Sequence, residues 1–154
     1  MSASVWLGVD LGEARVGLAL SDPELTLAYP IGNIEVGGDY FRALDQVVDL
    51  VHERLVEEVV VGYPLLLSGQ EGKSAKKASR WARNLARLLD APPVAEGHGV
   101  RVTLRDERLT TVSAHRQLSA ASVAGRQHRP RVDQQSAVVL LQSALDERAG
   151  GKEL

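Results

Sequence analysis

The sequence predicts an α/β protein with a mixed five-stranded sheet and helices on both faces. Three stretches of alternating apolar and polar residues, separated by turn-forming residues, fill residues 5–36 and predict an antiparallel meander. After residue 40 the apolar period changes from two to about 3.6, and strand and helix patterns then alternate. Such an order favours a mixed sheet with helices packed on its faces. We expect one domain over residues 1–149 and a frayed tail at 150–154.

The first three expected strands cover residues 5–10, 15–20 and 29–36. The first two are rich in β-branched and apolar residues, and Gly12 marks the tight turn between them. The third pattern is weaker because it contains Pro30, which cannot donate a ladder hydrogen bond.

A helix and a buried strand are expected next. Asp39 follows two glycines and is a credible N-cap for a helix over residues 41–55. The apolar face of this helix is expected to consist of Phe41, Leu44, Val48, Val51 and Leu55. Residues 58–62 form a short apolar run that is typical of a strand buried on both faces.

The middle of the chain predicts a loop, a second helix and a further strand. Residues 63–72 contain a proline and two glycines and are expected to form the loop. Residues 73–89 show helical spacing of apolar residues, and a proline pair ends this helix. Residues 100–105 alternate as a strand.

Two helices are expected in the last third of the chain, a short one over residues 111–118 and a final one over 133–148. Residues 124–131 between them are polar and basic, and Gly125 and Pro130 are helix breakers there. We therefore expect a loop directly before the final helix.

Composition excludes several classes of protein. There is no cysteine, which rules out disulfides and thiolate metal sites. The N-terminal residues lack the basic start and apolar run of a signal peptide, and no apolar stretch is long enough to span a bilayer. We expect a cytoplasmic protein with no membrane partner.

Charge is distributed unevenly along the chain, although the net charge is only −2. Residues 1–58 carry 11 acids and 3 bases, whereas residues 59–131 carry 5 acids and 13 bases. A basic section of this kind favours a local phosphate-binding surface. Arginine makes up 14 of the 18 bases, which suits bidentate phosphate contact, and a general preference for arginine is an equally open explanation.

Two clusters in the basic section are candidates for contact with nucleic acid. The helix over residues 73–89 has a polar face without a single acid, and its candidate residues are Lys73, Lys76, Lys77 and Arg80. The segment before the final helix contributes Arg126, His128, Arg129 and Arg131. A solvated helix face and a disordered basic loop are the competing interpretations.

Three acids stand where the ends of strands and helices would bring them together. Asp10 ends the first strand, Glu107 follows the last strand by two residues, and Asp133 opens the final helix. Helical spacing places Asp133 on the same face as four apolar residues, Ala137, Leu140, Leu141 and Ala144. Three gathered carboxylates repel one another unless a cation joins them, and Mg²⁺ or Mn²⁺ prefers such oxygen ligands. Two such ions would activate water and stabilise the leaving oxygen of a phosphodiester.

Each acid also has a structural explanation when it is taken alone. Asp10 fits an Asx-type turn, Asp133 fits a helix N-cap, and Glu107 fits a surface ion pair with Arg105 or Arg108. The catalytic interpretation depends on all three acids occurring together in this order.

Residues near these acids are candidates for supporting roles. Arg15 either positions a phosphate, braces Asp10 or forms a surface ion pair. Thr110 and Thr111 either donate hydrogen bonds near Glu107 or cap the following helix. Gly12 is needed for the turn after the first strand.

Four segments together resemble the YqgF/RuvX family, known as Holliday junction resolvases and as pre-16S rRNA nucleases. They are residues 10–19, 62–72, 106–111 and 133–142, and the most specific is Asp106-Glu107-Arg108-Leu109-Thr110-Thr111. The family has the RNase H-like fold and is distantly related to the resolvase RuvC. This sequence departs from the family pattern at Leu66-Leu67-Ser68, where a more polar run is usual, and at Ser136, where alanine is usual.

The resemblance implies that Asp10, Glu107 and Asp133 are the metal ligands of an endonuclease. It favours structured RNA as substrate, in the 5′-end processing of pre-16S rRNA and with pre-ribosomal particles as partners. Branched DNA remains open, and so does a non-catalytic nucleic-acid or ribosome-associated module of the same fold. Nucleotide binding of the actin type is disfavoured, because 154 residues supply only one lobe. A junction resolvase would be a homodimer, whereas an RNA nuclease can act as a monomer.

Overall fold

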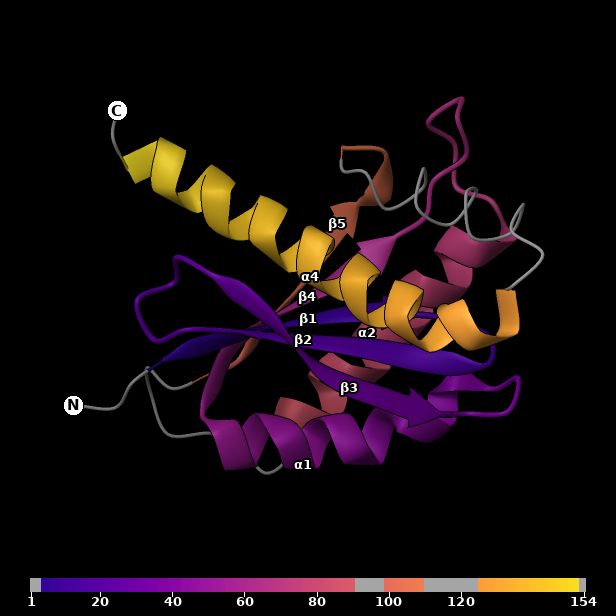
Figure 1. Ribbon diagram of the computed structural model, residues 1–154, viewed down its shortest axis with the longest axis horizontal. Helices are drawn as coiled ribbons and strands as arrows, with labels where there is room; N and C mark the ends of the chain where they lie inside the picture. The colour runs from indigo at the N-terminus through magenta and orange to yellow at the C-terminus, as the bar shows by residue number, and fades with distance from the viewer. Residues whose placement is uncertain (1–3, 91–98, 110–124, 153–154) are drawn as a thin grey trace.

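The computed structural model describes residues 4–90, 99–109 and 125–152, with the backbone alone for 109, 125–134 and 151–152. Five strands form one sheet in the order β3-β2-β1-β4-β5 (Figure 1). Their bounds are β1 Val5–Leu11, β2 Arg15–Ser21, β3 Ala28–Glu35, β4 Val56–Tyr63 and β5 Arg101–Asp106. The helices are η1 Tyr40–Ala43, α1 Leu44–Arg54, α2 Lys73–Asp90, η2 Glu107–Leu109 and α4 Gly125–Lys152.

The sheet is mixed, as the sequence predicts. β2 pairs with both β1 and β3 in antiparallel fashion. β4 pairs with β1 and β5 in parallel. Each strand lies within two residues of the bounds expected from the apolar alternation. The parallel strands β1, β4 and β5 therefore end at the same edge of the sheet, and this edge carries the residues discussed below.

Helices cover both faces of the sheet. α1 and α2 pack on one face against Leu7 and Val9 of β1, and α4 packs on the other face against Trp6 and its neighbours. Figure 1 shows α4 crossing the sheet on one side and α1 lying along the other. Successive side chains of a strand point to opposite faces, so the alternation along β1 assigns even-numbered residues to the α4 face.

Gly8 allows α4 to approach β1 closely. A Cβ on Gly8 would lie 2.8 Å from Leu141 Cβ and 2.9 Å from the carbonyl oxygen of Ala137. Gln142 fixes the same helix to the β2–β3 loop, because its side chain accepts from the Ala28 backbone N–H and donates to the Thr26 carbonyl oxygen, both at 2.9 Å. The position of α4 over β1 is therefore set by backbone contact and hydrogen bonds.

The first helix differs from the expectation. Asp39 caps a short 3₁₀ helix, η1, and α1 begins only at Leu44. Leu55 was expected on the apolar face but is 59% exposed, and it ends α1 in the left-handed conformation with φ 55°. The apolar period continued to Leu55, whereas the chain must turn there to enter β4.

The last helix begins earlier than expected. α4 starts at Gly125, so the segment predicted as a basic loop is helical and Pro130 lies inside the helix. Extending a helix that is already packed on a sheet costs less than starting a new one, and this outweighs the local preference of glycine and proline. The short helix expected over 111–118 lies outside the described residues.

Candidate active site

Asp10 lies near the end of β1 and is almost completely buried. Its exposed fraction is 1%, and its partner on β2 is Gly17. The residue two positions earlier, Gly8, faces α4, so Asp10 points to that same face of the sheet. Asp10 thus lies inside the fold, directly before the turn between β1 and β2.

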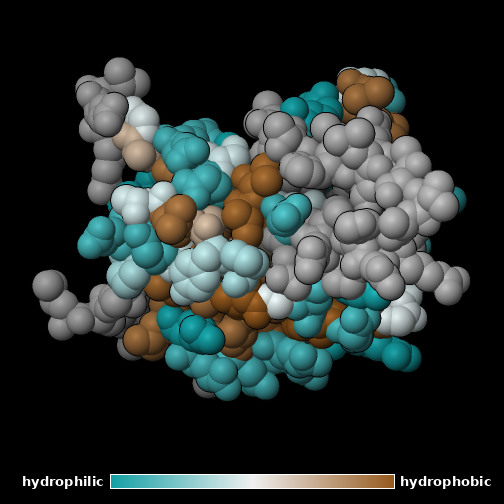
Figure 2. Space-filling view, viewed as in Figure 1, coloured by the Kyte–Doolittle hydropathy of each residue, from teal (hydrophilic) through white to brown (hydrophobic). Residues whose placement is uncertain are grey.

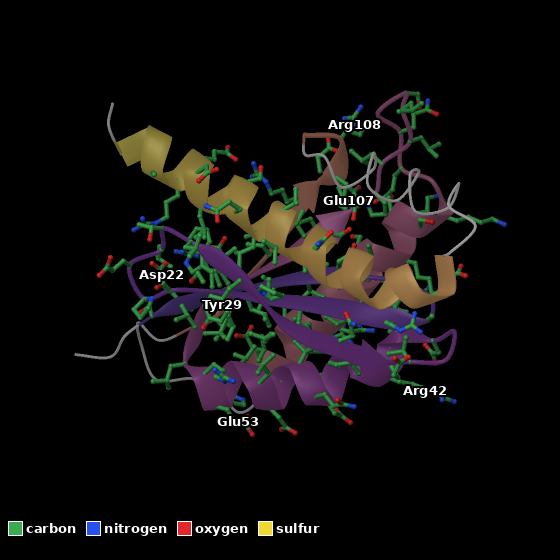
Figure 3. The ribbon with its side chains drawn as sticks, viewed as in Figure 1. Asp22, Tyr29, Arg42, Glu53, Glu107 and Arg108 are labelled. Atoms are coloured by element: carbon green, nitrogen blue, oxygen red, sulfur yellow. The ribbon has the colours of Figure 1, made fainter. Side chains whose placement is uncertain are left out.

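Glu107 follows β5 directly, at the start of η2, and only 3% of it is exposed. Its side chain lies over Gly62 of β4, because Glu107 Oε1 is 2.5 Å from the position that a Cβ on Gly62 would occupy. Figure 3 shows Glu107 between α4 and the sheet. The space left by the missing side chain of Gly62 is therefore filled by a carboxylate.

The register of the sheet brings these two acids to neighbouring strands. Val9 of β1 pairs with Val61 of β4, and the next step of this parallel ladder sets Asp10 beside Gly62. Adjacent strands lie about 4.8 Å apart. The Glu107 carboxylate thus lies above the strand that borders Asp10, on the face that α4 covers.

The surroundings of Glu107 hold it partly protonated. Burial, and to a lesser degree the charge of Asp106, raises the pKa of Glu107 to about 7. Asp106 itself is paired with Arg108, with 2.8 Å between Oδ2 and Nη2, and this lowers the pKa of Asp106. Arg105 is engaged with Glu147 and Ser143 of α4. Glu107 is therefore buried and not on the surface, and the two arginines named for the alternative ion pair are engaged with Glu147 and Asp106.

A third acid was expected at Asp133, whose side chain lies outside the described residues. Its backbone belongs to α4 and lies eight residues after the start of that helix, which excludes the N-cap interpretation. Among the side chains that are described, no three His, Asp or Glu residues gather closely enough to hold a metal ion. Thr110 and Thr111, and the side chains of Arg126, His128, Arg129 and Arg131, also lie outside the described residues.

The turn between β1 and β2 carries two of the expected supporting residues. The Gly12 backbone N–H donates to the Arg15 carbonyl oxygen at 3.0 Å and closes the turn. The Arg15 side chain pairs with Glu35 of β3, with 3.0 Å between Nε and Oε1. The structure thus contains the ion pair that was one of the three options for Arg15.

The basic face of α2 lies on the side of the sheet opposite to the acids. Lys77 stacks over the ring of Tyr40 at 4.6 Å, and Arg80 lies over Phe41 at 5.2 Å from the ring centre. Lys73 and Lys76 are exposed. They lie in the first turn of α2, which follows β4 and therefore begins at the edge of the sheet that carries Asp10 and Glu107. The four lysine and arginine candidates thus divide into two pairs with different surroundings.

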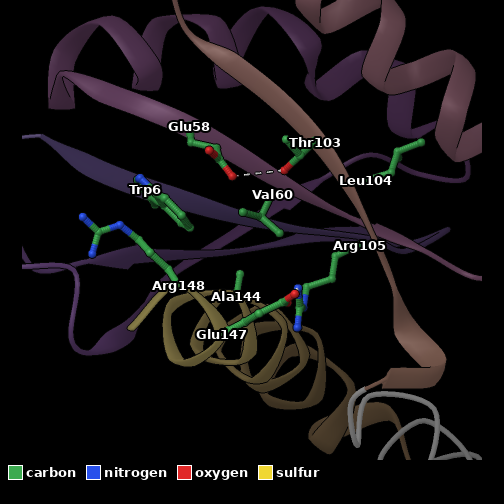
Figure 4. Close-up of a pocket in the computed structure, with 9 residues that line it drawn as sticks. All are labelled: Trp6, Glu58, Val60, Thr103, Leu104, Arg105, Ala144, Glu147 and Arg148. Atoms are coloured by element: carbon green, nitrogen blue, oxygen red, sulfur yellow. Dashed lines mark hydrogen bonds and ion pairs between the residues drawn. The ribbon is translucent and has the colours of Figure 1, made fainter. Parts of the chain in front are cut away.

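Two of the cavities in the described part of the structure lie near the ends of the sheet strands. One of about 310 Å³ lies beneath the β1–β2 turn and is lined in part by Gly12, Glu13, Tyr40, Ser74 and Lys77. The other, of about 330 Å³, lies at the start of β1 (Figure 4). It includes Glu58, which accepts from Thr103 Oγ1 at 3.3 Å. Neither cavity is lined by Asp10 or Glu107, so both are separate from the carboxylates.

Sequence reasoning missed the role of Gly62. Its place at the end of an apolar run was visible, but its contact with Glu107 depends on how β5 pairs with β4. The ion pair between Asp106 and Arg108 was also missed, since the sequence equally favoured pairing of Arg108 with Glu107. No described helix has the length and apolar character that a bilayer crossing requires.

Comparison with known proteins identifies what the chain is similar to. The model of a family described as "RuvX: Holliday junction resolvase" matches residues 4–147. A Bifidobacterium adolescentis protein named "Putative pre-16S rRNA nuclease" is 64% identical, over 92% of this chain and 97% of the relative. One of the same name from Thermobifida fusca is 44% identical, over 95% and 89%.

Solved structures share the fold. RuvC of T. thermophilus in complex with a Holliday junction substrate matches with a TM-score of 0.56 at 16% identity, covering 96% of each chain. The yeast mitochondrial Holliday junction resolvase Ydc2 matches with a TM-score of 0.60 at 11% identity, over 98% of this chain and 81% of the other. The expected RNase H-like architecture is confirmed.

Proposed function

We propose a function from the premise that this chain belongs to the RuvX family of Holliday junction resolvases. The chain is a nuclease, a hydrolase that acts on nucleic acid. Its reaction is endonucleolytic cleavage of a phosphodiester, which leaves a 5′-phosphate and a 3′-hydroxyl. The preferred substrate is the precursor of 16S rRNA near its mature 5′ end.

The observation that carries this proposal is the pair of buried carboxylates on one face of the sheet. Asp10 is 1% exposed and Glu107 is 3% exposed. The Glu107 carboxylate lies over Gly62, the residue of β4 that is next to Asp10. Burying two acids side by side is unfavourable unless protons or cations neutralise them. A structural protein gains nothing from this arrangement, whereas a hydrolase that binds cations needs it.

Asp133 supplies the third carboxylate. Trp6 of β1 belongs to the cluster with Ala144 of α4, and Gly8 contacts Ala137 and Leu141. Later residues of β1 therefore lie beside earlier residues of α4. Asp10 lies two residues beyond Gly8, and position 133 lies one helical turn before Ala137. This antiparallel crossing supports a place for Asp133 above Asp10, as helical spacing alone had suggested.

Mg²⁺ or Mn²⁺ fits the donor set. The acids offer only hard oxygen ligands, and the protein contains no cysteine. Asp10, Glu107 and Asp133 would hold the ions, two of them when substrate is bound. Such ions supply Lewis-acid stabilisation of the leaving oxygen and an activated water.

The remaining residues of the chain bind the substrate or support the acids. In the metal-free protein burial raises the pKa of Glu107 to about 7, and a bound cation would take the place of this proton. Lys73 and Lys76 neutralise backbone phosphates at the edge of the sheet. Arg126, His128, Arg129 and Arg131 extend the basic surface along the start of α4, and Thr110 and Thr111 orient Glu107. The Arg15 and Glu35 pair stiffens the β1–β2 turn that carries Gly12 next to Asp10.

Branched DNA is the second candidate substrate. It is favoured by the description of the family as a Holliday junction resolvase. RNA takes precedence because the relatives of 64% and 44% identity are both named for pre-16S rRNA. A junction substrate would require two active sites in a homodimer, whereas a site in pre-ribosomal particles is reached by a monomer.

A cleavage panel tests the proposal. Wild type, Asp10→Asn, Glu107→Gln and Asp133→Asn are assayed on a pre-16S rRNA fragment and on a four-way DNA junction, at matched salt, with Mg²⁺, Mn²⁺ or EDTA. We expect metal-dependent cleavage of the RNA by wild type alone, with the fold of each variant intact by circular dichroism. Undiminished cleavage by Asp10→Asn would defeat the assignment of the site.

A further inference from the structure

The loop between β4 and α2, residues 64–72, presents two leucines to solvent. Leu67 is 93% exposed and Leu66 is 51% exposed. Figure 2 shows apolar atoms at the top of the molecule, where Figure 1 draws this projecting loop. No other large apolar side chain in the described residues is as exposed as that of Leu67.

The loop has a defined structure rather than an open one. The Leu66 backbone N–H donates to the Gln70 carbonyl oxygen at 3.0 Å, and the Gly69 N–H donates to the Leu66 carbonyl oxygen at 2.8 Å. At the base of the loop the Tyr63 hydroxyl donates to Glu71. The Leu66 side chain packs over Gly72 at 3.1 Å, measured to a Cβ built there. Leu67 is therefore held outward on a supported base.

This loop borders the candidate active site. It begins after Tyr63, which directly follows the Gly62 that Glu107 covers. Its Gly69 lies against Arg108, the residue after Glu107, with 3.3 Å between Arg108 Nη1 and a Cβ built on Gly69. Figure 3 shows Arg108 beside this loop. Five residues span at most about 18 Å, which bounds the distance from Gly62 to Leu67.

Cations lie on the segments that adjoin this loop. Lys73 and Lys76 follow the loop in the first turn of α2, and the partly exposed Arg108 lies against Gly69 of the loop. Glu71 and Asp106 are the acids of this region, and they are engaged with Tyr63 and Arg108. A nucleotide combines a phosphate that such cations bind with a base whose faces are apolar.

We propose that Leu67, supported by Leu66, inserts against an unpaired base of the substrate beside the scissile phosphodiester. This inference rests on the proposed nuclease function and adds the class of substrate. The preferred nucleic acid has a boundary between paired and unpaired nucleotides at this position. In a continuous duplex the same insertion requires unstacking of a base step, which costs a few kcal/mol.

The binding experiment uses the base analogue 2-aminopurine, whose fluorescence reports stacking. It is placed at successive unpaired positions of an RNA duplex with a single-stranded overhang, and each RNA is mixed with Asp10→Asn protein and Mg²⁺. We expect the fluorescence to change on binding at one or two adjacent positions. Adding Leu67→Ser to this protein removes the change, and adding Leu67→Phe keeps it. The matched control is Leu27→Ser, because Leu27 is 60% exposed in the β2–β3 loop, distant from the acids.

The kinetic experiment measures kcat/KM on the overhang substrate and on a fully paired duplex of the same sequence. Partial burial of a leucine corresponds to about a tenfold change in an equilibrium constant. We expect the kcat/KM of Leu67→Ser to fall about tenfold on the overhang substrate and to be unchanged on the duplex. Leu27→Ser is unchanged on both.

The outcomes separate this inference from the proposed function. If wild type cleaves and Leu67→Ser matches it in fluorescence and in kcat/KM, the inference is wrong while the nuclease function stands. If wild type cleaves nothing but the fluorescence change depends on Leu67, the function is wrong and the contact with a base stands. A change of particle mass in light scattering for Leu67→Ser, without loss of the fluorescence change, assigns the tip to a protein interface and overturns the inference.

Discussion

At the scale of single residues, Gly62 determines where the Glu107 carboxylate lies. β4 passes beneath Glu107, and the absence of a side chain at Gly62 leaves room for Glu107 Oε1. The clash that a methyl group would cause involves the flexible end of a glutamate. A substitution of Gly62 by alanine should therefore displace the Glu107 carboxylate more than it destabilises the fold.

Gly62→Ala should separate activity from stability. We expect cleavage to fall by about 100-fold, because a misplacement of about 1 Å at a catalytic group has that effect. The free energy of unfolding should change by less than about 1 kcal/mol, since only the end of a flexible side chain must move. Cleavage rates and urea unfolding measure both quantities.

The control for this substitution is Gly99→Ala, because a Cβ there meets nothing within 4 Å. It should leave both cleavage and unfolding unchanged. Normal cleavage by Gly62→Ala would show that the carboxylate of Glu107 need not lie over β4.

Glu107 should also make the stability of the metal-free protein depend on pH. Its pKa is about 7 in the folded protein and 4.5 in the unfolded chain, so the folded state binds more protons between these values. The contribution of Glu107 to stability is therefore fully present below pH 4.5 and is lost as the pH rises towards 7. The loss is at most about 3–4 kcal/mol, because each tenfold difference in proton affinity between the two states corresponds to about 1.4 kcal/mol.

The measurement is urea unfolding in EDTA over that pH range, for wild type and Glu107→Gln. The glutamine variant cannot titrate, so the difference between the two curves isolates this group. Curves that run parallel would mean that the buried carboxylate keeps an ordinary pKa.

At the scale of elements, all five strands could be predicted from the sequence, four from apolar alternation and β4 from a continuous apolar run that is buried on both faces. The same reasoning failed at Leu55 and Pro130, where the path of the chain and the packing of α4 outweigh local preference. Asp10 and Glu107 were predictable because they stand at strand ends. The role of Gly62 was not, since it arises from the register between β4 and β5, which no local pattern encodes.

Gly8→Ala, unlike Gly62→Ala, should mainly reduce the stability of the fold. The added Cβ would meet the backbone oxygen of Ala137 at 2.9 Å, and a helix held by Gln142 cannot move freely away. We expect a loss of about 1–3 kcal/mol in the free energy of unfolding, which is the usual cost of overpacking. Urea unfolding measures it.

The control is Gly150→Ala, in the last turns of the same helix, where a Cβ meets nothing within 4 Å. It should not destabilise the protein. An unchanged midpoint for Gly8→Ala would show that α4 tolerates a shift away from β1.

At the scale of the whole molecule, the acids and most of the basic face of α2 occupy opposite sides of the sheet. They come together only at the edge where β4 ends and α2 begins. α2 then runs back away from this edge, so its bases differ in distance from the site. The N-terminal lysines are near the site, whereas Arg87 in the last turn is far from it.

The salt dependence of RNA binding should reflect this gradient. Lys76→Ala should reduce the slope of log affinity against log salt by about one, because one phosphate contact is lost. Arg87→Ala, the same change of charge on the same helix, should leave the slope unaltered. Fluorescence anisotropy over a series of salt concentrations measures it, and equal slopes for both variants would mean that the whole face of α2 contacts RNA.

The order of elements along the chain has a consequence for biosynthesis. All five strands, Asp10 and Glu107 precede α4, which packs on one face of the sheet and contains Asp133. A nascent chain therefore carries only two of the three proposed ligands and an uncovered apolar surface until translation has passed this helix. The proposed ligand set and the cover over this apolar surface would then be completed together, once α4 has been synthesised.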